Sequence, residues 1–215
     1  MYIPDQFREE RPEVLAAAMQ EIRLAVLVTH LAGEYHATHL PMLLKSAEDG
    51  TLTLEGHVAR ANPHWRASQP DGAPSLAIFQ GPHAYISPFW YASKREHGKV
   101  VPTWNYIAVH AIGILEAIED RDWLLALVSD LTNANEAGRE NPWSIADAPA
   151  EYVERQVAAI VGLRLKVDRL EGAWKMNQHR PVADRLGTIE GLRQAEGTGP
   201  SVAAIMTALE RERSS

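Results

Sequence analysis

The sequence contains no cysteine, which excludes disulfides, thiolate metal sites, iron–sulfur clusters and a cysteine nucleophile. No apolar run approaches the roughly 20 residues that a membrane-spanning helix needs. The N-terminal residues also lack the basic and apolar regions of a signal peptide. We therefore expect a cytoplasmic protein with no membrane partner.

Several functional motifs are missing as well. Neither G-x-G-x-x-G nor G-x-x-x-x-G-K-[ST] occurs, so dinucleotide-binding and P-loop folds lose their main support. No G-x-S-x-G marks a serine nucleophile. The formal net charge is −7, from 21 basic and 28 acidic residues, which argues against a domain that mainly binds nucleic acid.

Apolar spacing predicts the elements that are present. A helix over Pro12–Ile22 precedes a strand at Leu24–Val28, a turn at Ala32–Glu34 and two further strands. Short connections make these strands an antiparallel meander. The remaining predicted features are a loop at Gln69–Pro74, a mobile loop at Ser93–Lys99, a helix after Asp120, a turn at Glu171–Gly172, a helix at Pro149–Val157, and strands at Tyr35–Lys45, Thr51–Val58, Ser75–Phe79, Ala84–Ser87, Val101–Ile118 and Ile160–Leu170.

The sum of these elements is a mainly β protein with peripheral helices, of the α+β class. So many antiparallel strands favour a closed or split barrel, because closure removes exposed edges. A break at Thr198–Ser201 precedes a last amphipathic helix. We expect one domain over residues 1–195 and a C-terminal helical tail over 196–215.

The most informative stretch runs from Glu55 to Arg66, where a strand ends and a helix begins. Asn62 is a favourable helix cap and Pro63 a favourable first helical residue. Arg60 beside the free amides of a helix start would make an anion site suited to a phosphate. The alternative is that Asn62 only caps a helix and that Arg60 is a solvated surface charge.

Other polar and aromatic groups are candidates too. His36 and His39 are three residues apart, which on a strand places them on opposite faces and does not favour a metal site. Trp104 lies with polar neighbours at the start of a predicted strand. This mixture suits a site for an aromatic ligand, and the alternative is that Trp104 belongs to the core or to a dimer interface. Lys175 lies at the end of a predicted strand, beside residues with amide side chains. Its ammonium could bind a ligand carbonyl, and the alternative is a solvated polar strand end.

Five segments in this order resemble the FMN-binding negative transcriptional regulators of the PaiB type, which have the FMN-binding split-barrel fold. The resemblance covers the chain from Met1 to about Leu192. The segments are His39–Pro41, Gly56–Trp65, Phe79–Pro88, Val101–Ala111 and Lys175–Arg180.

The resemblance implies a homodimer with FMN bound at the subunit interface. The phosphate would lie near Arg60 and Asn62, with His57 and Trp65 close by, and the isoalloxazine ring along Thr38 and His39. The partner subunit would contribute from its own copies of Trp104, Asn105, Lys175 and Gln178.

Four functions remain open at this point. The first is an FMN-binding regulator, although only the loop Lys94–Lys99 offers a local basic contact for DNA and no helix-turn-helix unit is evident. The second is an FMN-dependent oxidoreductase or flavin reductase. The third is a haem-binding split barrel, and the fourth is a structural dimer with an inactive pocket.

Overall fold

A computed structural model describes residues 1–31, 33–69 and 71–214 of the chain. Its strands form one eight-stranded sheet in the order β3-β2-β6-β7-β8-β5-β4, with β1 paired to β8. The strands are β1 (Arg8–Glu9), β2 (Leu24–Leu31), β3 (Glu34–Pro41), β4 (Leu43–Ser46), β5 (Leu52–Ala59), β6 (Ala73–Ile86), β7 (Thr103–Ile118) and β8 (Ile160–Lys175).

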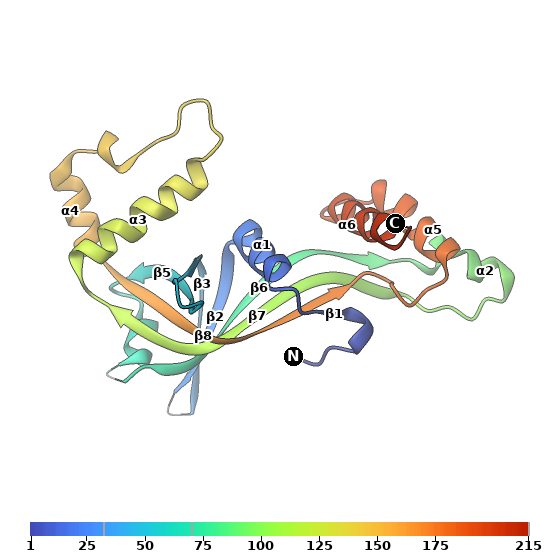
Figure 1. Cartoon of the computed structure of the whole chain (residues 1–215), viewed down its shortest axis with the longest axis horizontal. Coiled ribbons are helices and arrows are strands. Elements are labelled where there is room, and N and C mark those ends of the chain that lie inside the picture. Colours follow the sequence, from blue (N-terminus) through green and yellow to red (C-terminus); the bar gives the residue numbers. More distant parts are fainter. Residues whose placement is uncertain (32, 70, 215) are drawn as a thin grey trace. The chain divides into compact units, whose positions relative to one another are not determined.

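Helices flank this sheet, as the sequence predicts (Figure 1). The α-helices are α1 (Pro12–Ile22), α2 (Ala92–Glu96), α3 (Arg121–Glu136), α4 (Ala150–Ala158), α5 (Val182–Arg193) and α6 (Gly199–Ser214). The 3-10 helices are η1 (Asp5–Phe7), η2 (Pro63–Ser68), η3 (Pro88–Trp90) and η4 (Ile145–Asp147). Because β3 and β4 end the strand order, the sheet is split rather than closed.

The chain divides into two compact units. Unit 1 comprises Met1–Leu15, Gln80–Val109 and Glu171–Ser215, and unit 2 comprises Ala16–Phe79 and His110–Leu170. In unit 1, α5 and α6 pack on each other, so the last helix is tied to the rest of that unit. The boundary expected at residue 195 stays a prediction.

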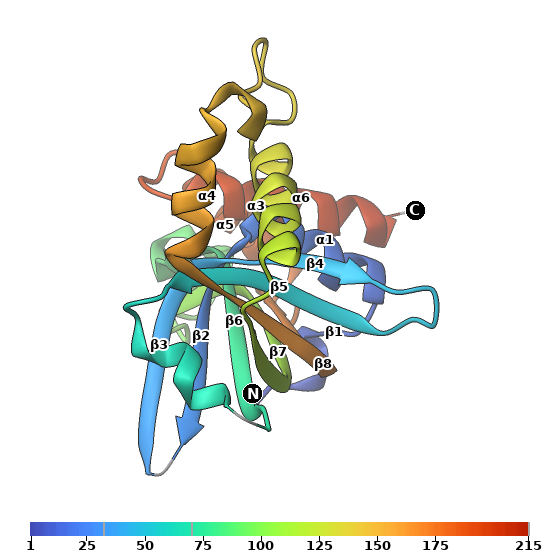
Figure 2. The same cartoon turned by 90° about the vertical axis from the view of Figure 1, so that its left-hand side faces the viewer.

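Unit 2 contains the predicted hairpins and a pair of helices. Strand β2 pairs with β3, with Leu24 opposite Pro41 and Leu31 opposite Glu34. Strand β4 pairs with β5, and β5 continues onto β8. Helices α3 and α4 lie side by side at one end of this unit (Figure 2).

The expected meander is therefore wrong. Pro41 ends β3, and the chain turns through Met42 into β4, which pairs only with β5 along the described strand order. Proline lacks the amide that would continue the ladder, so the predicted single strand over Tyr35–Lys45 becomes the two edge strands of the sheet. Two hairpins at opposite ends of the strand order replace three neighbouring strands.

Strands β6 and β8 are longer than the sequence suggests. The expected break at Gly81–Pro82 lies inside β6, beyond the segment Ser75–Ile78 that pairs with β2. Beyond Ile78 the described register with β2 has ended, and an unpaired side of a strand tolerates proline because it needs no ladder amide. The expected turn at Glu171–Gly172 is likewise inside β8, because β1 pairs with β8 at this point.

Two loops also differ from expectation. The predicted mobile loop at Ser93–Lys99 contains α2, which is anchored because Asp184 accepts from both the amide (2.9 Å) and the hydroxyl (2.8 Å) of Ser93. Helix α5 was not anticipated. In the expected turn and surface loop, Ala32 and Pro70 lie outside the described residues.

Candidate functional site

A polar network lies where β2, β3, β6 and η2 meet in unit 2. Asn62 caps η2, because its Oδ1 accepts from the amide of His64 at 2.9 Å. The other end of the Asn62 amide donates to Thr38 Oγ1 at 3.2 Å. Thr38 Oγ1 is also 2.9 Å from Nδ1 of His64. The predicted residues Thr38 and Asn62 are thus brought together, with His64 as a link that the sequence did not single out.

The network continues into the core and fixes the ring of His64. The Ser75 hydroxyl donates to the Ala73 carbonyl oxygen (3.0 Å), so its oxygen accepts from the Thr29 hydroxyl at 2.7 Å. Thr29 Oγ1 then accepts from Nε2 of His64 at 3.0 Å. This counting assigns the Nε2–H tautomer to His64, and its Nδ1 accepts the hydroxyl proton of Thr38.

The electrostatics agree with a neutral ring. His64 is buried, and this burial, followed by the nearby charge of His36, lowers the pKa of His64 to about 4. The hydroxyl proton of Thr38 is used by His64, so what Thr38 can offer a ligand is an acceptor lone pair. Thr38 therefore suits an N–H group of a ligand better than a phosphate oxygen.

Arg60 lies beside this network but bonds to other parts of unit 2. Its Nε donates to the Ala158 carbonyl oxygen at 3.1 Å, and its Nη2 donates to the Ile160 carbonyl oxygen at 3.2 Å. Its Nη1 pairs with Glu119. The side chains of Arg60 and Glu119 are 41% and 46% exposed, so solvent and solutes reach this ion pair.

Among the described residues, the first two positions of η2 offer no free backbone amide beside Arg60, contrary to the expected open row. Pro63 has no N–H, and the backbone amide of His64 already donates to Oδ1 of Asn62. The helix itself is a short 3-10 helix rather than an α-helix. Trp65 turns back onto the same segment, where its Nε1 donates to the Arg60 carbonyl oxygen at 3.0 Å.

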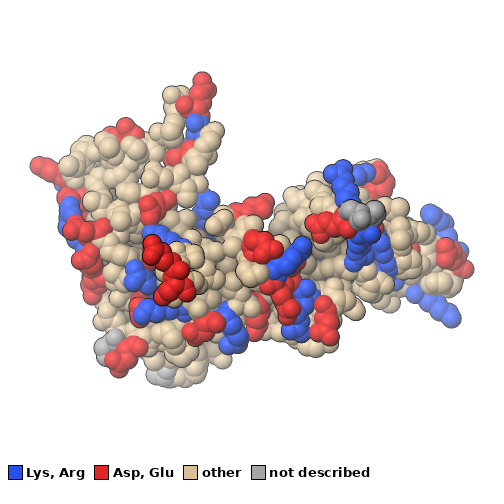
Figure 3. Space-filling view, in the orientation of Figure 1, with Lys and Arg blue, Asp and Glu red and all other residues tan. Residues whose placement is uncertain are grey.

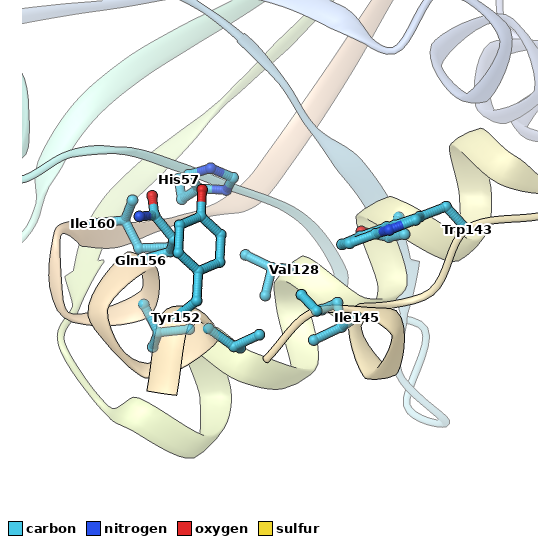
Figure 4. Close-up of a pocket in the computed structure, with 11 residues that line it drawn as sticks. His57, Val128, Trp143, Ile145, Tyr152, Gln156 and Ile160 are labelled. Atoms are coloured by element: carbon cyan, nitrogen blue, oxygen red, sulfur yellow. The ribbon is translucent and has the colours of Figure 1, made fainter. Parts of the chain in front are cut away.

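Two predicted residues of unit 2 lie apart from the network. His39 is exposed and alternates with Thr38 along β3, so the two side chains lie on opposite faces of that strand. His57 lies on β5 and lines a pocket of about 240 Å³ beneath α3 and α4 (Figure 4). Burial lowers the pKa of His57.

Unit 1 holds the other predicted group. Trp104 is 52% exposed and contacts the rings of His83 and Tyr85, with centroids 6.1 Å away in each case. Lys175 Nζ donates to Thr103 Oγ1 at 2.7 Å. Burial lowers the pKa of Lys175, and a ligand oxygen carrying negative charge would suit its ammonium.

Asn105 and Gln178 point into unit 1. Asn105 is fully buried, and its Nδ2 donates to Sδ of Met206 at 3.4 Å. The Gln178 amide folds over its own loop, accepting from the amide of Met176 at 2.7 Å and donating to the Trp174 carbonyl oxygen. Each therefore orders the chain around Lys175 in the structure described.

The donor chemistry of these residues fits a flavin mononucleotide. A guanidinium and an amide in unit 2 suit a phosphate, and the acceptor of Thr38 suits a ring N–H. In unit 1, the exposed side chain of Trp104 suits a flat ring, and the ammonium of Lys175, which donates to a neutral hydroxyl, suits a flavin carbonyl.

Comparison with known proteins supports this chemistry. Residues 1–169 match the family described as "Putative FMN-binding domain". The chain is 36% identical over 196 residues to "Protease synthase and sporulation protein PAI 2" of Bacillus subtilis, covering 91% of each protein. It is 31% identical to an uncharacterized protein of Emericella nidulans, covering 99% of this chain and 97% of that protein.

Solved structures share the fold at low identity. The FAD- and heme-binding protein of Mycobacterium smegmatis has a TM-score of 0.59 and 18% identity, over 83% of this chain and 78% of that one. The flavocytochrome Anf3 of Azotobacter vinelandii has a TM-score of 0.55 and 13% identity, over 78% and 69%. The chain belongs to the PaiB-type FMN-binding family, is a split-barrel flavoprotein, and has FMN as its cofactor.

Proposed function

We propose that the chain works as a homodimer that holds FMN between its subunits and serves as a PaiB-like regulator. The observation that carries the dimer is an apolar sheet face in unit 2. This face, called the outer face below, consists of Val26, Val28, Leu76, Ile78, Ile112 and Ile114, which are all half-buried.

The outer face follows from strand alternation. Val26 lies opposite Ile78, and Val28 opposite Leu76, so these four side chains project from the same side of the sheet. Their neighbours Leu27 and Ala77 project to the other side and are fully buried. An antiparallel sheet with one solvated face normally alternates apolar with polar residues. A solvated face made of valine, leucine and isoleucine instead fits an interface between two copies.

Ile78→Lys tests the dimer. A lysine in the middle of the outer face would place an unpaired charge in the interface, so we expect a monomer by light scattering and a loss of bound FMN. Leu186→Lys is the matched control, because Leu186 is 53% exposed on α5 and lies outside the outer face. A dimer that persists in Ile78→Lys would refute this interface.

The phosphate is assigned to Arg60 and Asn62, with Glu119 as its competitor. In this proposal the carbonyl oxygens of residues 158 and 160 hold the guanidinium in place, and phosphate replaces the carboxylate of Glu119. Removing the competing charge and removing the ligand should then have opposite effects on FMN affinity.

Two variants separate these effects. Glu119→Gln should bind FMN several-fold more tightly, and Arg60→Ala should bind it at least about tenfold more weakly. Riboflavin, which has no phosphate, should respond to neither change. Equal FMN affinity in wild type and Arg60→Ala, measured by fluorescence quenching, would remove Arg60 from the site.

The ring is assigned to a position along the strand that carries Thr38 and His39 in one subunit, with Trp104, Asn105, Lys175 and Gln178 contributed by the other copy. Trp65 completes the proposed surroundings of the phosphate. Support comes from the acceptor lone pair of Thr38 and from the ammonium of Lys175, which donates to a neutral hydroxyl. Lys175→Met should weaken binding of FMN and of riboflavin alike, unlike Arg60→Ala.

The surface charge of the protein bears on whether regulation involves direct DNA contact. On the face shown in Figure 3, basic and acidic side chains are interspersed. Lys94 of α2 lies over the ring of Phe89 at 4.0 Å. The Bacillus relative is named for protease synthesis and sporulation, which fits a regulatory role. A gel shift at low salt with DNA upstream of the chain's own gene tests direct binding.

A redox function is the second candidate, and the observation that favours it is the ammonium of Lys175, which donates to Thr103 Oγ1 at 2.7 Å and would stabilise negative charge on a reduced flavin bound beside it. FMN supplies the hydride chemistry when it is bound. Stopped-flow mixing with NADH or NADPH decides this, because an oxidoreductase would bleach the flavin absorbance. The visible spectrum of the purified protein also tests haem binding, since haem gives a Soret band and flavin gives two broad bands.

A further inference from the structure

The pocket that His57 lines is built from one end of unit 2 (Figure 4). Val128 comes from α3, Trp143 from the segment before η4, Ile145 from η4 itself, and Tyr152 from α4. Its volume of about 240 Å³ is slightly below the roughly 300–1,000 Å³ of sites for drug-sized ligands. A molecule of one or two fused rings is the size that fits.

The wall that carries Trp143 is held in place by hydrogen bonds. The amide of Trp143 donates to Glu136 Oε2 at 3.1 Å, and the amide of Ser144 donates to Asp147 Oδ2 at 2.8 Å. Ser144 and Asp147 together form a capping box at η4. The pocket is therefore formed before a ligand arrives, and binding does not have to order this segment.

The lining sets the chemistry of a ligand. The pocket is lined mainly by apolar side chains, with His57, Thr132, Tyr152 and Gln156 as polar members, and no Asp, Glu, Lys or Arg is among its described lining residues. A charged ligand would lose its hydration without gaining a counter-charge. In Figure 4 His57, Tyr152 and Gln156 gather at one end of the pocket, and Trp143 lies at the other.

His57 supplies a specific unmet interaction. Its Nδ1 is buried and has no hydrogen-bond partner among the described residues, which costs free energy that a ligand could recover. Trp143 and Tyr152 are 48% and 49% exposed, so two large aromatic rings at the pocket remain largely uncovered. A flat ligand would cover both rings and could meet the imidazole.

We propose that this pocket binds an uncharged, planar aromatic molecule with one hydrogen-bonding group, separately from FMN. His57 pairs with the polar group of that molecule, and Trp143 and Tyr152 cover its ring. The proposal moves His57 from the flavin phosphate to this second ligand. It does not depend on the homodimer.

Indole is the probe, titrated into the purified full-length protein by calorimetry and by ligand-detected NMR. We expect saturable binding at one site per chain. Indole-3-acetate and tryptamine, which add a negative or a positive charge to the same ring system, should bind at least about tenfold more weakly. The same titration in the presence of saturating FMN should give an unchanged indole affinity.

Three variants locate the site. Val128→Phe fills the pocket and His57→Leu removes the polar group, so each should weaken indole binding at least about tenfold. Tyr152→Ala, at an exposed position that tolerates truncation, provides the same test if a core variant does not fold. Tyr35→Ala, at a tyrosine that is 77% exposed outside the pocket, should bind indole as wild type does.

Several outcomes would overturn the proposal. One is no saturable indole binding, and another is equal affinity in Tyr152→Ala and Tyr35→Ala, which would place the binding elsewhere. Displacement of indole by FMN would also overturn it, because the pocket would then belong to the flavin site.

Discussion

Acid should destabilise this protein through one buried histidine, His64. Its ring is 2% exposed and bonded on both sides, to Thr38 and to Thr29. Protonation would turn Nδ1 into a donor toward Thr38, whose oxygen already accepts from Asn62. The hydroxyl proton of Thr38 would then lose its acceptor, so the charged ring would disrupt the network as well as lose hydration.

The size of the effect follows from proton linkage. Burial holds the pKa of His64 at about 4, below the 6.5 of an unperturbed histidine. Between these values the unfolded chain binds more protons than the folded chain, so stability falls as the pH falls through that window. The full shift corresponds to about 3 kcal/mol. About 2 kcal/mol of this should be lost between about pH 7 and about pH 5.

The assay is urea unfolding followed by tryptophan fluorescence at both pH values, in wild type and in His64→Gln. Burial also lowers the pKa of His57 and of His179, so wild type loses stability from those groups too. The difference between the two proteins isolates His64. We expect His64→Gln to be less stable at about pH 7 and to lose about 2 kcal/mol less on acidification.

His30→Gln is the matched control, because His30 lies on the neighbouring end of β2 and is exposed. Because this variant keeps the His64 network, the loss on acidification that comes from His64 should remain. If His64→Gln and wild type lose stability equally, the network does not hold a neutral ring. An NMR titration that finds the His64 pKa near 6.5 would also refute the reasoning.

Three further changes test the packing of the chain. Gly113→Ala should cost about 1–3 kcal/mol in thermal unfolding, because its Cβ would overlap the Lys166 carbonyl oxygen of β8; an unchanged melting temperature would contradict that approach. Glu210→Gln removes the carboxylate that Arg185 bonds at 2.6 Å, so urea unfolding should show a loss of about 3 kcal/mol rather than none. Asp120→Ala should cost about 1 kcal/mol and Asp120→Asn much less, since Asp120 caps α3 through the amide of residue 123.

Local chemistry accounts for what could be predicted about the fold. Helix α1 spans Pro12–Ile22 as its apolar spacing indicates, and Asp120 caps α3 as expected. These features depend on neighbours a few residues away, which a single sequence displays. Strand pairing is different, because the break at Pro41 and the continuity of β8 through Gly172 depend on which distant strand lies alongside.

Helix α5 also depends on a distant contact that local sequence patterns do not show. It contains Gly187 and Gly191, which lower helix propensity and give it no clear apolar stripe. In the structure, a Cβ at either glycine would overlap Trp90, so the tryptophan packs where side chains are missing. Tertiary contact with a residue about one hundred positions away stabilises a helix that the local sequence pattern does not predict.

The candidate site divides in the same way. The segment from Arg60 to Trp65 stands out in the sequence, because a cap, a proline and an arginine occur together. The sequence by itself determined the cofactor family and the polar character of the segment from Arg60 to Trp65. Only the tertiary structure decided that Glu119 pairs with Arg60 and that Thr29 fixes the ring of His64. The physical reason is that caps and turns are short-range, whereas ion pairs and buried hydrogen-bond chains join residues that only folding brings together.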